Sequence, residues 1–528
     1  MGGAMAEGLL QSEKFIPSDI TVSDHNQPVL DHFASKGASV TLDNQLACHG
    51  ADIVCVVVKP WCVEKTLKGI KDALDYKSQK LVVVAAGVPS ANIKEWLDKD
   101  GVTPTFFLVM PNIAIAYKQS MTFITPVDAS ATEIQQITEI FDELGESLIM
   151  EERLFPAATA MSCAIAYAMR YVRANENLRR FVEAENVPVV TTIMGKGAIP
   201  TTHPLYVGNC GMHGKYAANK AVSECDLLFS IGTRFNDRIT GDLNEFAPKA
   251  KIVHIDVDTA SISRNVVVDV PIVADANVAL DKLNEWAEPK KTAEWQKQIK
   301  AWDEENPLGM RRDKGMTPQM IMEHINKNYK DAIYVTDVGQ HQMWATQYLE
   351  LDSNSQLLTS GGLGTMGFGL PAAIGAKIAN PDKDVVCISG DGGLQMNIQE
   401  LATSVVQGAG VTICVLNNYY LGMVRQMQQL FYGKRYSATC LRRRKGCPDE
   451  CKGPSEACPP YTPDFIKLVE SYGGHGIRVE KEEDIDAAFA EAKKYKDVPV
   501  IIEFMIATDE IVLPMVKSGN PMSEMILK

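Results

Sequence analysis

The chain has 528 residues, of which 46% are hydrophobic, and its formal net charge is −14. That length predicts several domains, at about 100–200 residues each. The negative charge argues against non-specific nucleic-acid binding. No apolar run approaches the ~20 residues of a membrane span. No signal peptide is recognisable, so the sequence predicts a cytoplasmic protein without membrane segments.

Residues 1–122 alternate apolar runs with helical patterns. This alternation predicts an α/β fold with a doubly wound parallel sheet, whose ligand lies at the carboxyl ends of the strands. The expected strands lie near residues 20–24, 51–60, 80–87 and 104–112.

The chain opens with MGGAMAEGLL. A glycine pair suits a tight turn before a helix, where backbone N–H groups can hold a pyrophosphate. No strand precedes these glycines, so an ordinary helix start is an equal alternative. Asp24 follows Gly3 by 21 residues and stands where a ribose-binding acid is expected. The alternative for Asp24 is a simple turn residue.

The ordered series GGAMAEGL, LDN, VVVKP, AAGV and VMPN resembles pyrroline-5-carboxylate reductase, the last enzyme of proline synthesis, over about residues 1–174. The resemblance implies NAD(P) as cofactor and pyrroline-5-carboxylate as substrate. It also implies a Rossmann-like NAD(P)-binding segment, 1–122, and a helical dimerisation segment, 123–174. The implied pyrophosphate contacts are Gly2, Gly3, Ala4 and Met5; the implied cleft residues are Asn44, Val58, Lys59, Pro60, Ala86 and Gly87, with Pro111 and Asn112 beside the nicotinamide.

Three departures from that family matter. The first strand and first fingerprint glycine are missing, with Met1 in the place of that glycine. MSCAIAY, residues 161–167, replaces a small-residue loop. The helical segment stops near Ala174, without the later Thr-Gly segment that binds the imino acid. A reductase without half of its substrate site should be badly impaired.

Residues 167–190, YAMRYVRANENLRRFVEAENVPVV, predict one continuous amphipathic helix followed by an apolar strand. The segments that follow predict a six-stranded α/β domain over 175–287 and a charged linker over 288–315. Within this domain, Arg234 and Arg238 stand four apart after a buried strand. Two such arginines can clamp phosphates, and surface salt bridges are the alternative.

The strongest motif lies at residues 390–418, GDGGLQMNIQELATSVVQGAGVTICVLNN, within a third domain over 316–505. Two parallel neighbouring strands should deliver Asp391 and Asn418 to one sheet edge. With the backbone carbonyl of Tyr420, their oxygens suit a Mg²⁺ that also binds a diphosphate. Gly392 and Gly393 let the backbone approach that diphosphate. GDG followed by NN after 24 residues is the thiamine diphosphate fingerprint.

The segments VGQHQMWA, TSGGLGTMGFGLPAAIGA, NNYYLGMVRQMQQLFY and, in the C-terminal tail 506–528, VLPMVKSGNPMSEMI resemble the acetolactate synthase large subunit over residues 175–528. That family condenses two pyruvates, or pyruvate with 2-ketobutyrate, as a homo-oligomer that can carry a regulatory subunit. The resemblance implies thiamine diphosphate contacts from Gln340, His341, Gly390, Met366 (the wedge that bends the cofactor) and Met423 (on the pyrimidine side). It implies FAD contacts from Thr192, Met212, His213, Gly232, Arg234, Arg238, Asp256 and Asp275.

This second resemblance also has departures. Asn236 stands where the family usually has aspartate, and Met427 where it usually has tryptophan. The pyrimidine-binding domain, with the glutamate that activates the cofactor, has no counterpart here, nor has the first strand of the central domain. The catalytic acid therefore stays unassigned. The chain reads as a hybrid of two incomplete enzymes; the alternatives are a non-enzymatic cofactor-binding remnant or a misassembled two-gene product, with another thiamine enzyme such as glyoxylate carboligase in third place.

One further cluster consists of Cys440, Cys447, Cys451 and Cys458, with 6, 3 and 6 residues between them. Four thiolates can hold zinc or an iron–sulfur centre. The alternative is a basic surface insertion with free thiols.

Overall fold

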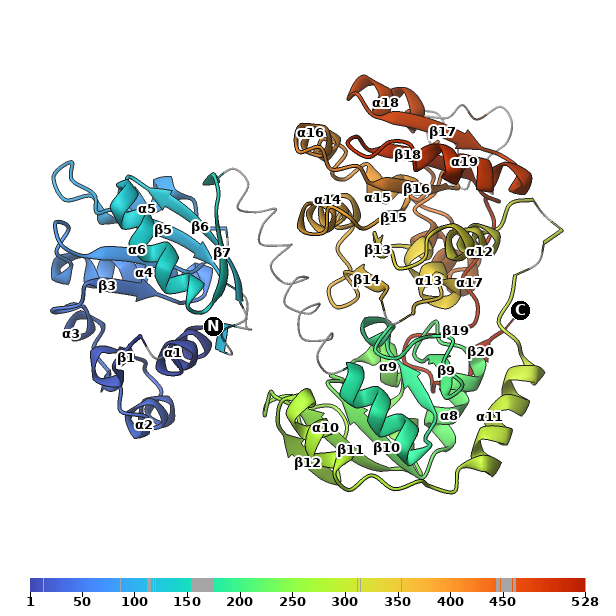
Figure 1. Cartoon of the computed structure of the whole chain (residues 1–528), viewed down its shortest axis with the longest axis horizontal. Coiled ribbons are helices and arrows are strands. Elements are labelled where there is room, and N and C mark those ends of the chain that lie inside the picture. Colours follow the sequence, from blue (N-terminus) through green and yellow to red (C-terminus); the bar gives the residue numbers. More distant parts are fainter. Residues whose placement is uncertain are drawn as a thin grey trace. The chain divides into compact units, whose positions relative to one another are not determined.

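The computed structural model describes residues 1–12, 14–85, 87–111, 115–116, 118, 120–152, 175–310, 312–313, 315–352, 354–442, 447, 458 and 462–527. The chain divides into two compact units, Met1–Arg170 (unit 1) and Tyr171–Lys528 (unit 2), both of α/β class (Figure 1). Among the described residues, we find no helix with the length and apolar character that crossing a membrane requires.

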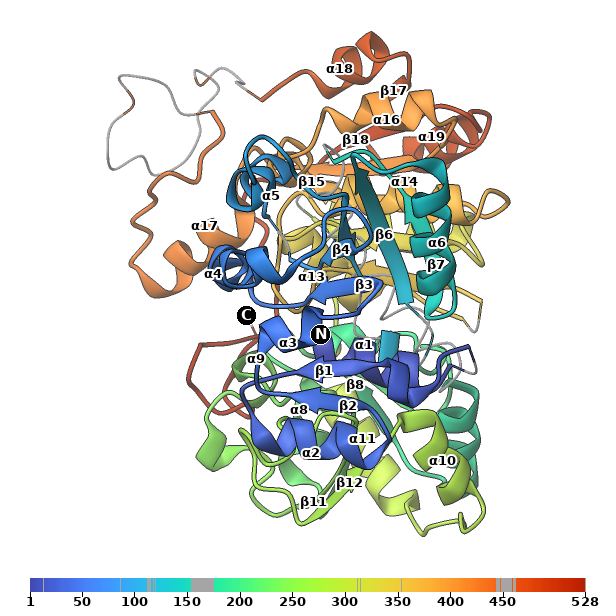
Figure 2. The same cartoon turned by 90° about the vertical axis from the view of Figure 1, so that its left-hand side faces the viewer.

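Unit 1 holds two separate sheets. β1 (Thr21–Ser23) and β2 (Ser39–Thr41) form a parallel pair, against which α2 (Gln27–Ser35) packs through Phe33 and Val29 (Figure 2). The second sheet has the order β3 (Ile53–Val56), β4 (Lys80–Val83), β5 (Phe106–Met110), β6 (Ser120–Val127), β7 (Gly145–Ile149). All its pairs are parallel except β5–β6. The strands expected near 20–24, 51–60, 80–87 and 104–112 are confirmed.

The predicted boundary at residue 122 is wrong, because it falls inside β6. β6 is the run SMTFITPV, whose alternation of Thr, Phe and Ile suits a strand, and Phe123 and Ile124 are buried. A capping box of Ser130 and Glu133 then starts α6 (Ala131–Asp142), which leads back into β7. Residues 123–149 therefore continue the sheet, and the expected dimerisation helix in 153–174 lies outside the described residues.

Helix α1 (Gly2–Leu10) joins the two sheets of unit 1. Met5 packs into the core of the five-stranded sheet, whereas Ala6 and Leu10 pack with Phe33 beside the β1–β2 pair. Gly8 is required here, since a Cβ atom would lie 2.3 Å from the Ile115 carbonyl oxygen. The other helices of this unit are α3 (Asn44–Cys48), α4 (Pro60–Ile70) and α5 (Ser90–Leu97).

The central part of unit 2 differs from the predicted six-stranded domain. After helical residues 175–185, its described strands divide into a parallel pair and a three-stranded parallel sheet. The pair is β8 (Val189–Thr191) with β9 (Tyr206–Asn209); the sheet is β10 (Leu227–Ile231), β11 (Lys251–Asp256) and β12 (Val270–Val273). The helices are α8 (Tyr216–Glu224), α9 (Asp237–Thr240) and α10 (Ala276–Asn284).

The predicted linker over 288–315 contains a helix, α11 (Ala293–Glu305). Trp295, Ile299 and Trp302 recur at helical spacing and pack on Ala217 and Ala221 of α8. Because most residues of this segment are charged or polar, the apolar stripe was not recognised, and the prediction of a plain linker over 288–315 was wrong.

The third part of unit 2 is a doubly wound parallel sheet, as predicted. Its order is β14 (Gln356–Thr359), β13 (Ile333–Thr336), β15 (Val385–Gly390), β16 (Thr412–Asn417), β18 (Val500–Met505), β17 (His475–Val479). Figure 1 shows α14 (Gly369–Ala379) and α16 (Glu400–Val406) on one face, with α18 (Phe465–Ser471) above them. α12 (Pro318–Asn328), α13 (Gln340–Tyr348) and α19 (Ile485–Ala492) cover the other face.

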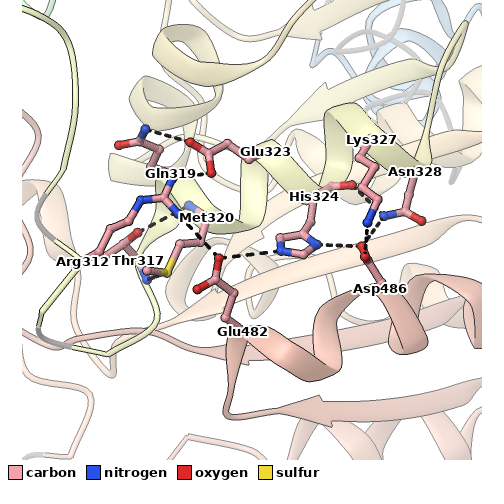
Figure 3. Close-up of polar contacts among 10 residues, drawn as sticks. All are labelled: Arg312, Thr317, Gln319, Met320, Glu323, His324, Lys327, Asn328, Glu482 and Asp486. Atoms are coloured by element: carbon pink, nitrogen blue, oxygen red, sulfur yellow. Dashed lines mark hydrogen bonds and ion pairs between the residues drawn. The ribbon is translucent and has the colours of Figure 1, made fainter.

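A polar network ties α12 to α19 (Figure 3). Nδ1 of His324 lies 2.6 Å from Oδ1 of Asp486, and the Asn328 amide donates to the same oxygen at 2.7 Å. Lys327 pairs with the second carboxylate oxygen. Hydrogen bonds from Lys327 and His324 hold the pKa of Asp486 well below its usual range. The carboxylate is therefore the centre of this contact between two helices.

We expect Asp486→Asn to lower the free energy of unfolding of unit 2 by about 1 kcal/mol at pH 7, since charge-assisted bonds to a partly exposed carboxylate are lost. A depressed carboxyl pKa stabilises the fold above the unfolded pKa of about 4. The difference between wild type and variant should thus shrink as the pH falls below about 4. Denaturant unfolding at several pH values measures this, with exposed Asp382→Asn as control; equal effects of the two substitutions would contradict it.

Candidate functional site

Three neighbouring strands of the large sheet end at one edge. β13, β15 and β16 are adjacent and parallel, and they are followed by Asp337, Asp391 and Asn418 respectively. All three side chains are buried. The register of the sheet thus brings two carboxylates and an amide to the same carboxyl edge, where α/β sheets bind ligands.

Asp391 is the most unusual of these groups. Its Oδ1 accepts a hydrogen bond from the Gly392 N–H at 2.8 Å, whereas its buried Oδ2 has no hydrogen-bond partner. Burial raises the pKa of this carboxyl to about 7. A buried carboxylate oxygen without a donor is costly unless a cation meets it, so this atom fits a metal ligand.

Asn418 lies beside Asp391 on the next strand end. Its Oδ1 accepts a hydrogen bond from the Tyr420 N–H at 3.0 Å, and its Nδ2 donates to Gln340 at 3.3 Å. Tyr419, between Asn418 and Tyr420, has a left-handed backbone conformation with φ 61°, which turns the chain sharply. Asn418 and buried Tyr420 therefore belong to one tight turn at the sheet edge.

The glycines of the GDGG turn have no room for side chains. A Cβ atom added to Gly390 would lie 2.8 Å from Nδ1 of His341, and one added to Gly392 would lie 2.6 Å from Cδ2 of Leu421. Cε of Met366 lies 3.8 Å from the Cβ position of Gly392, so the predicted wedge residue stands next to this turn.

Asp337 is a residue that the sequence analysis missed. Its carboxylate accepts hydrogen bonds from the backbone N–H groups of Gly367, at 3.0 Å, and Gly369, at 2.8 Å. It thereby fixes the loop that carries Met366. The available signal was an aspartate that directly follows a buried strand and directly precedes the VGQH segment.

Gln340 and a second missed residue, Gln426, join two helices to the tail. Gln340 donates to Oε1 of Gln426 at 2.9 Å and to the Glu510 carbonyl at 3.0 Å. Gln426, in α17 (Gly422–Phe431), donates to the Val512 carbonyl and accepts from the Val512 N–H. In the same helix, half-buried Met423 packs against the core.

His341 lies in the first turn of α13, beside the GDGG segment. Its Nε2 is buried without a hydrogen-bond partner, and burial lowers the pKa of the ring to about 4. The imidazole is therefore neutral at pH 7, and one nitrogen remains available to a ligand.

In the central part of unit 2, some of the predicted FAD contacts meet. The Met212 N–H donates to the Arg238 carbonyl at 2.8 Å, and burial lowers the pKa of neighbouring His213 to about 4. Nδ1 of His213 is buried without a partner. Arg234 and Arg238 are exposed, and Arg238 lies 3.8 Å from Asp237. The surface ion pair that was the alternative is thus present for Arg238.

The remaining predicted FAD contacts take part in local backbone structure. Thr192 caps a short helical turn, accepting from the Gly195 N–H at 3.2 Å. Asp275 caps α10, and Asp256 accepts from the Asp258 N–H at 2.8 Å. Gly232 has φ 65°. These roles are structural, and they leave the prediction of FAD contacts untested.

In unit 1, the glycine pair stands at the start of α1. The Cβ position of Gly2 lies 3.5 Å from Cβ of Val57, just past the end of β3. Ala4 and buried Met5 follow in the helix. Of the other predicted cofactor contacts, Pro60 starts α4, Gly87 has φ 74°, and Pro111 is buried. Ala86 and Asn112 lie outside the described residues.

The cysteine cluster stays a prediction. Cys440 forms a β-bridge with Tyr420, whereas Cys451 lies outside the described residues. Within the described part of the chain, no group of three or more His, Cys, Asp or Glu side chains is arranged to hold a metal.

Residues 337–504 match the family model for the thiamine pyrophosphate enzyme, C-terminal TPP binding domain, and residues 164–283 match the central domain of the same enzymes. The chain contains thiamine pyrophosphate enzyme domains. Residues 1–87 match the model for NADP oxidoreductase, coenzyme F420-dependent, so a Rossmann-like nucleotide-binding segment is present as well.

Curated relatives agree for the second unit. The acetolactate synthase large subunit of Corynebacterium glutamicum is 44% identical over 359 residues, which are 66% of this chain and 55% of that protein. The large subunit of Haemophilus influenzae is 40% identical over 361 residues, 67% of this chain and 60% of that protein. The probable large subunit of Methanococcus aeolicus is 43% identical over 375 residues, 67% and 59% of the two chains. The chain thus spans less than two thirds of the length of these relatives.

We expect Gly393→Ala to disrupt this site. The new Cβ atom would lie 2.5 Å from Oδ1 and 2.9 Å from Cγ of Asp337, so the Asp337 clamp must shift. Overpacking of this kind costs about 1–3 kcal/mol, measurable by denaturant unfolding. Gly309→Ala is the matched control, because its nearest neighbour would be 3.9 Å away. Equal stability of the two variants would contradict the close approach.

Proposed function

We propose that unit 2 binds thiamine diphosphate through Mg²⁺. The metal would be held by the side chains of Asp391 and Asn418 and by the backbone carbonyl of Tyr420, with diphosphate oxygens as further ligands. The partnerless Oδ2 of Asp391 supports this most directly. The match of residues 337–504 to a TPP binding domain supports the same conclusion.

The residues around the turn suit a diphosphate. Gly390, Gly392 and Gly393 bring the backbone close, and the neutral ring of His341 offers Nε2 as a hydrogen-bond group. Gln340 is held by Gln426 and is therefore fixed in orientation. Met366 and Met423 present half-buried apolar surface that limits water near the cofactor.

When bound, thiamine diphosphate supplies the carbon nucleophile for decarboxylation of 2-keto acids and carbon–carbon bond formation. The proposed reaction is that of the named relatives, acetolactate synthesis from pyruvate, or from pyruvate with 2-ketobutyrate, in branched-chain amino-acid biosynthesis. The support is the 40–44% identity to acetolactate synthase large subunits. A homo-oligomer, with or without a regulatory subunit, is part of this proposal.

FAD is proposed for the central part of unit 2. The partnerless Nδ1 of His213 and the exposed guanidinium of Arg234 fit a polar, anionic cofactor. The nearby Gly232, with φ 65°, keeps its backbone open to a ligand. The proposed contacts are those implied by the resemblance, with Met212 and Arg238 already joined by a hydrogen bond.

The proposed chemistry also needs an acid–base group. Activation of the cofactor needs a carboxylic acid positioned as a general acid–base group, and in the resembled family that acid comes from a pyrimidine-binding domain. Among the residues described at this edge, the carboxylates are engaged otherwise: Asp337 holds the loop, and Asp391 is proposed as a metal ligand. The proposed acid–base group is therefore a residue other than Asp337 and Asp391.

For unit 1 we propose binding of a nicotinamide nucleotide at the carboxyl edge of its strands, beside the first turn of α1. The support is the match of residues 1–87 to an NADP oxidoreductase model and the glycine pair at the helix start. Reduction of pyrroline-5-carboxylate, in proline biosynthesis, is the activity that the resemblance proposes for it.

We expect Asp391→Asn to weaken binding of thiamine diphosphate with Mg²⁺ by at least about tenfold, because a charged metal ligand is lost. The fold should survive, since an amide is cheaper to bury than a carboxylate. Titration calorimetry measures the affinity, and Asp384→Asn, at the opposite end of the same strand, is the control. Unchanged binding in Asp391→Asn would exclude the proposed ligand.

We expect the purified chain, supplied with thiamine diphosphate, Mg²⁺ and FAD, to make no acetolactate from pyruvate. Adding the pyrimidine-binding domain of a full-length relative as a separate polypeptide should produce acetolactate, measured as acetoin after acid treatment. The Asp391→Asn chain with the same added domain is the control and should stay at background. Clear production by the chain alone would show that no second polypeptide is needed.

A further inference from the structure

The carboxyl ends of β1 and β2 meet at one corner of unit 1. The hydroxyl of Ser23, the last residue of β1, donates to Oδ1 of Asn44 at 2.8 Å, and Asn44 begins α3 just after β2. Asp24 follows Ser23 directly. One of its carboxylate oxygens accepts from the Asn26 N–H at 2.9 Å, so the carboxylate is held at the strand end.

The first turn of α1 lies against α2. The Cβ position of Gly3 is 3.7 Å from Cζ of Phe33, in α2, and α2 starts immediately after the turn that contains Asp24. The Cβ position of Gly2 faces Val57, past the end of β3. A nucleotide with its pyrophosphate at this helix start can therefore place its adenosine ribose toward the end of β1.

The turn that follows β1 carries the carboxylate of Asp24. At the C-terminal end of α2, Glu7 lies 2.6 Å from Nε2 of His32 and pairs with Nζ of Lys36 at 2.6 Å. His25 is fully exposed, and its Nδ1 lies 3.4 Å from the Asp24 carboxylate. The segment 20–31 contains neither lysine nor arginine.

From these observations we propose that unit 1 prefers NAD(H) to NADP(H), with Asp24 as the residue that sets the preference. This proposal rests on the nicotinamide-nucleotide binding proposed above. A carboxylate at the end of this strand accepts hydrogen bonds from the ribose hydroxyls of NAD. The 2′-phosphate of NADP would instead meet that carboxylate and find no free arginine or lysine on the adjoining turn.

Lys59 is the cation that could reverse the preference. It follows β3, and its ammonium lies 5.2 Å from the ring centroid of the exposed Trp61, on the far side of α1 from β1. That position suits the pyrophosphate or nicotinamide portion of the nucleotide better than the adenosine ribose. Its substitution therefore separates the two explanations.

The test titrates the full chain with NADH and with NADPH, following nucleotide fluorescence. We expect NADH to bind at least about tenfold more tightly, the equivalent of one good charge-assisted contact. Asp24→Ser with His25→Arg should reverse the order, and Asp24→Asn alone should weaken NADH. Asp31→Asn, an exposed acid on α2, is the control and should change neither affinity.

Tighter binding of NADPH by the wild-type chain would overturn the proposal, as would a preference for NADH that Asp24→Asn leaves unchanged. If Lys59→Ala selectively weakens NADPH and Asp24→Ser with His25→Arg does not strengthen it, Lys59 rather than Asp24 governs the choice. Absence of binding by both nucleotides, with intact folding by circular dichroism, would overturn the proposed nucleotide site itself. The failure of the site and the failure of the preference thus give different results.

Discussion

The burial of the Asp391 carboxylate is the constraint on which the site in unit 2 depends. Burial raises the pKa of this group to about 7, and one of its oxygens lacks a hydrogen-bond donor. Such a group is expensive to keep in a folded protein. The surrounding residues are adapted to this buried group. The positions beside it are glycines, where a side chain would not fit, and the Asp337 carboxylate holds the neighbouring loop by accepting hydrogen bonds from backbone N–H groups. A bound cation would remove the cost, so the arrangement is informative about ligand chemistry.

Both units place glycines beside the carboxyl ends of parallel strands. In both, parallel strands end beside glycines, which leave the backbone open to close approach by a ligand. In unit 2 the strand ends carry Asp391 and Asn418, whose oxygens are the proposed ligands of a cation that would be bound together with a diphosphate. In unit 1 the strand end carries Asp24, which suits neutral ribose hydroxyls. Both strand ends carry an aspartate, and the two differ in burial: the Asp391 side chain is buried, whereas that of Asp24 is partly exposed.

Local patterns were sufficient to predict the strands near Asp24 and the adjacency of Asp391 and Asn418, because spacing and apolar runs encode both. Other features depend on contacts between distant residues and were not predictable in this way. Gln426 reaches Val512 across 86 positions, and Asp337 reaches Gly367 across 30. β6 and α11 were missed for a related reason. The boundary at residue 122 came from the family resemblance, and the linker over 288–315 was predicted from its charged composition. The short apolar patterns in these segments form a strand and a helix because they pack into the core.

The central strands of unit 2 show why its parts depend on one another. The β8–β9 pair and the β10–β12 sheet share no ladder. Segments distant in the sequence support this region. α11 packs on α8, and the Val516 N–H donates to the Met212 carbonyl. Gly241 lies close to the backbone of Asn520, since a Cβ atom added to Gly241 would be 2.2 Å from the Asn520 carbonyl oxygen. The tail also holds Gln340 through Gln426. Loss of the tail would therefore disturb the central region and the diphosphate edge together, so cofactor binding has to be measured with unit 2 intact.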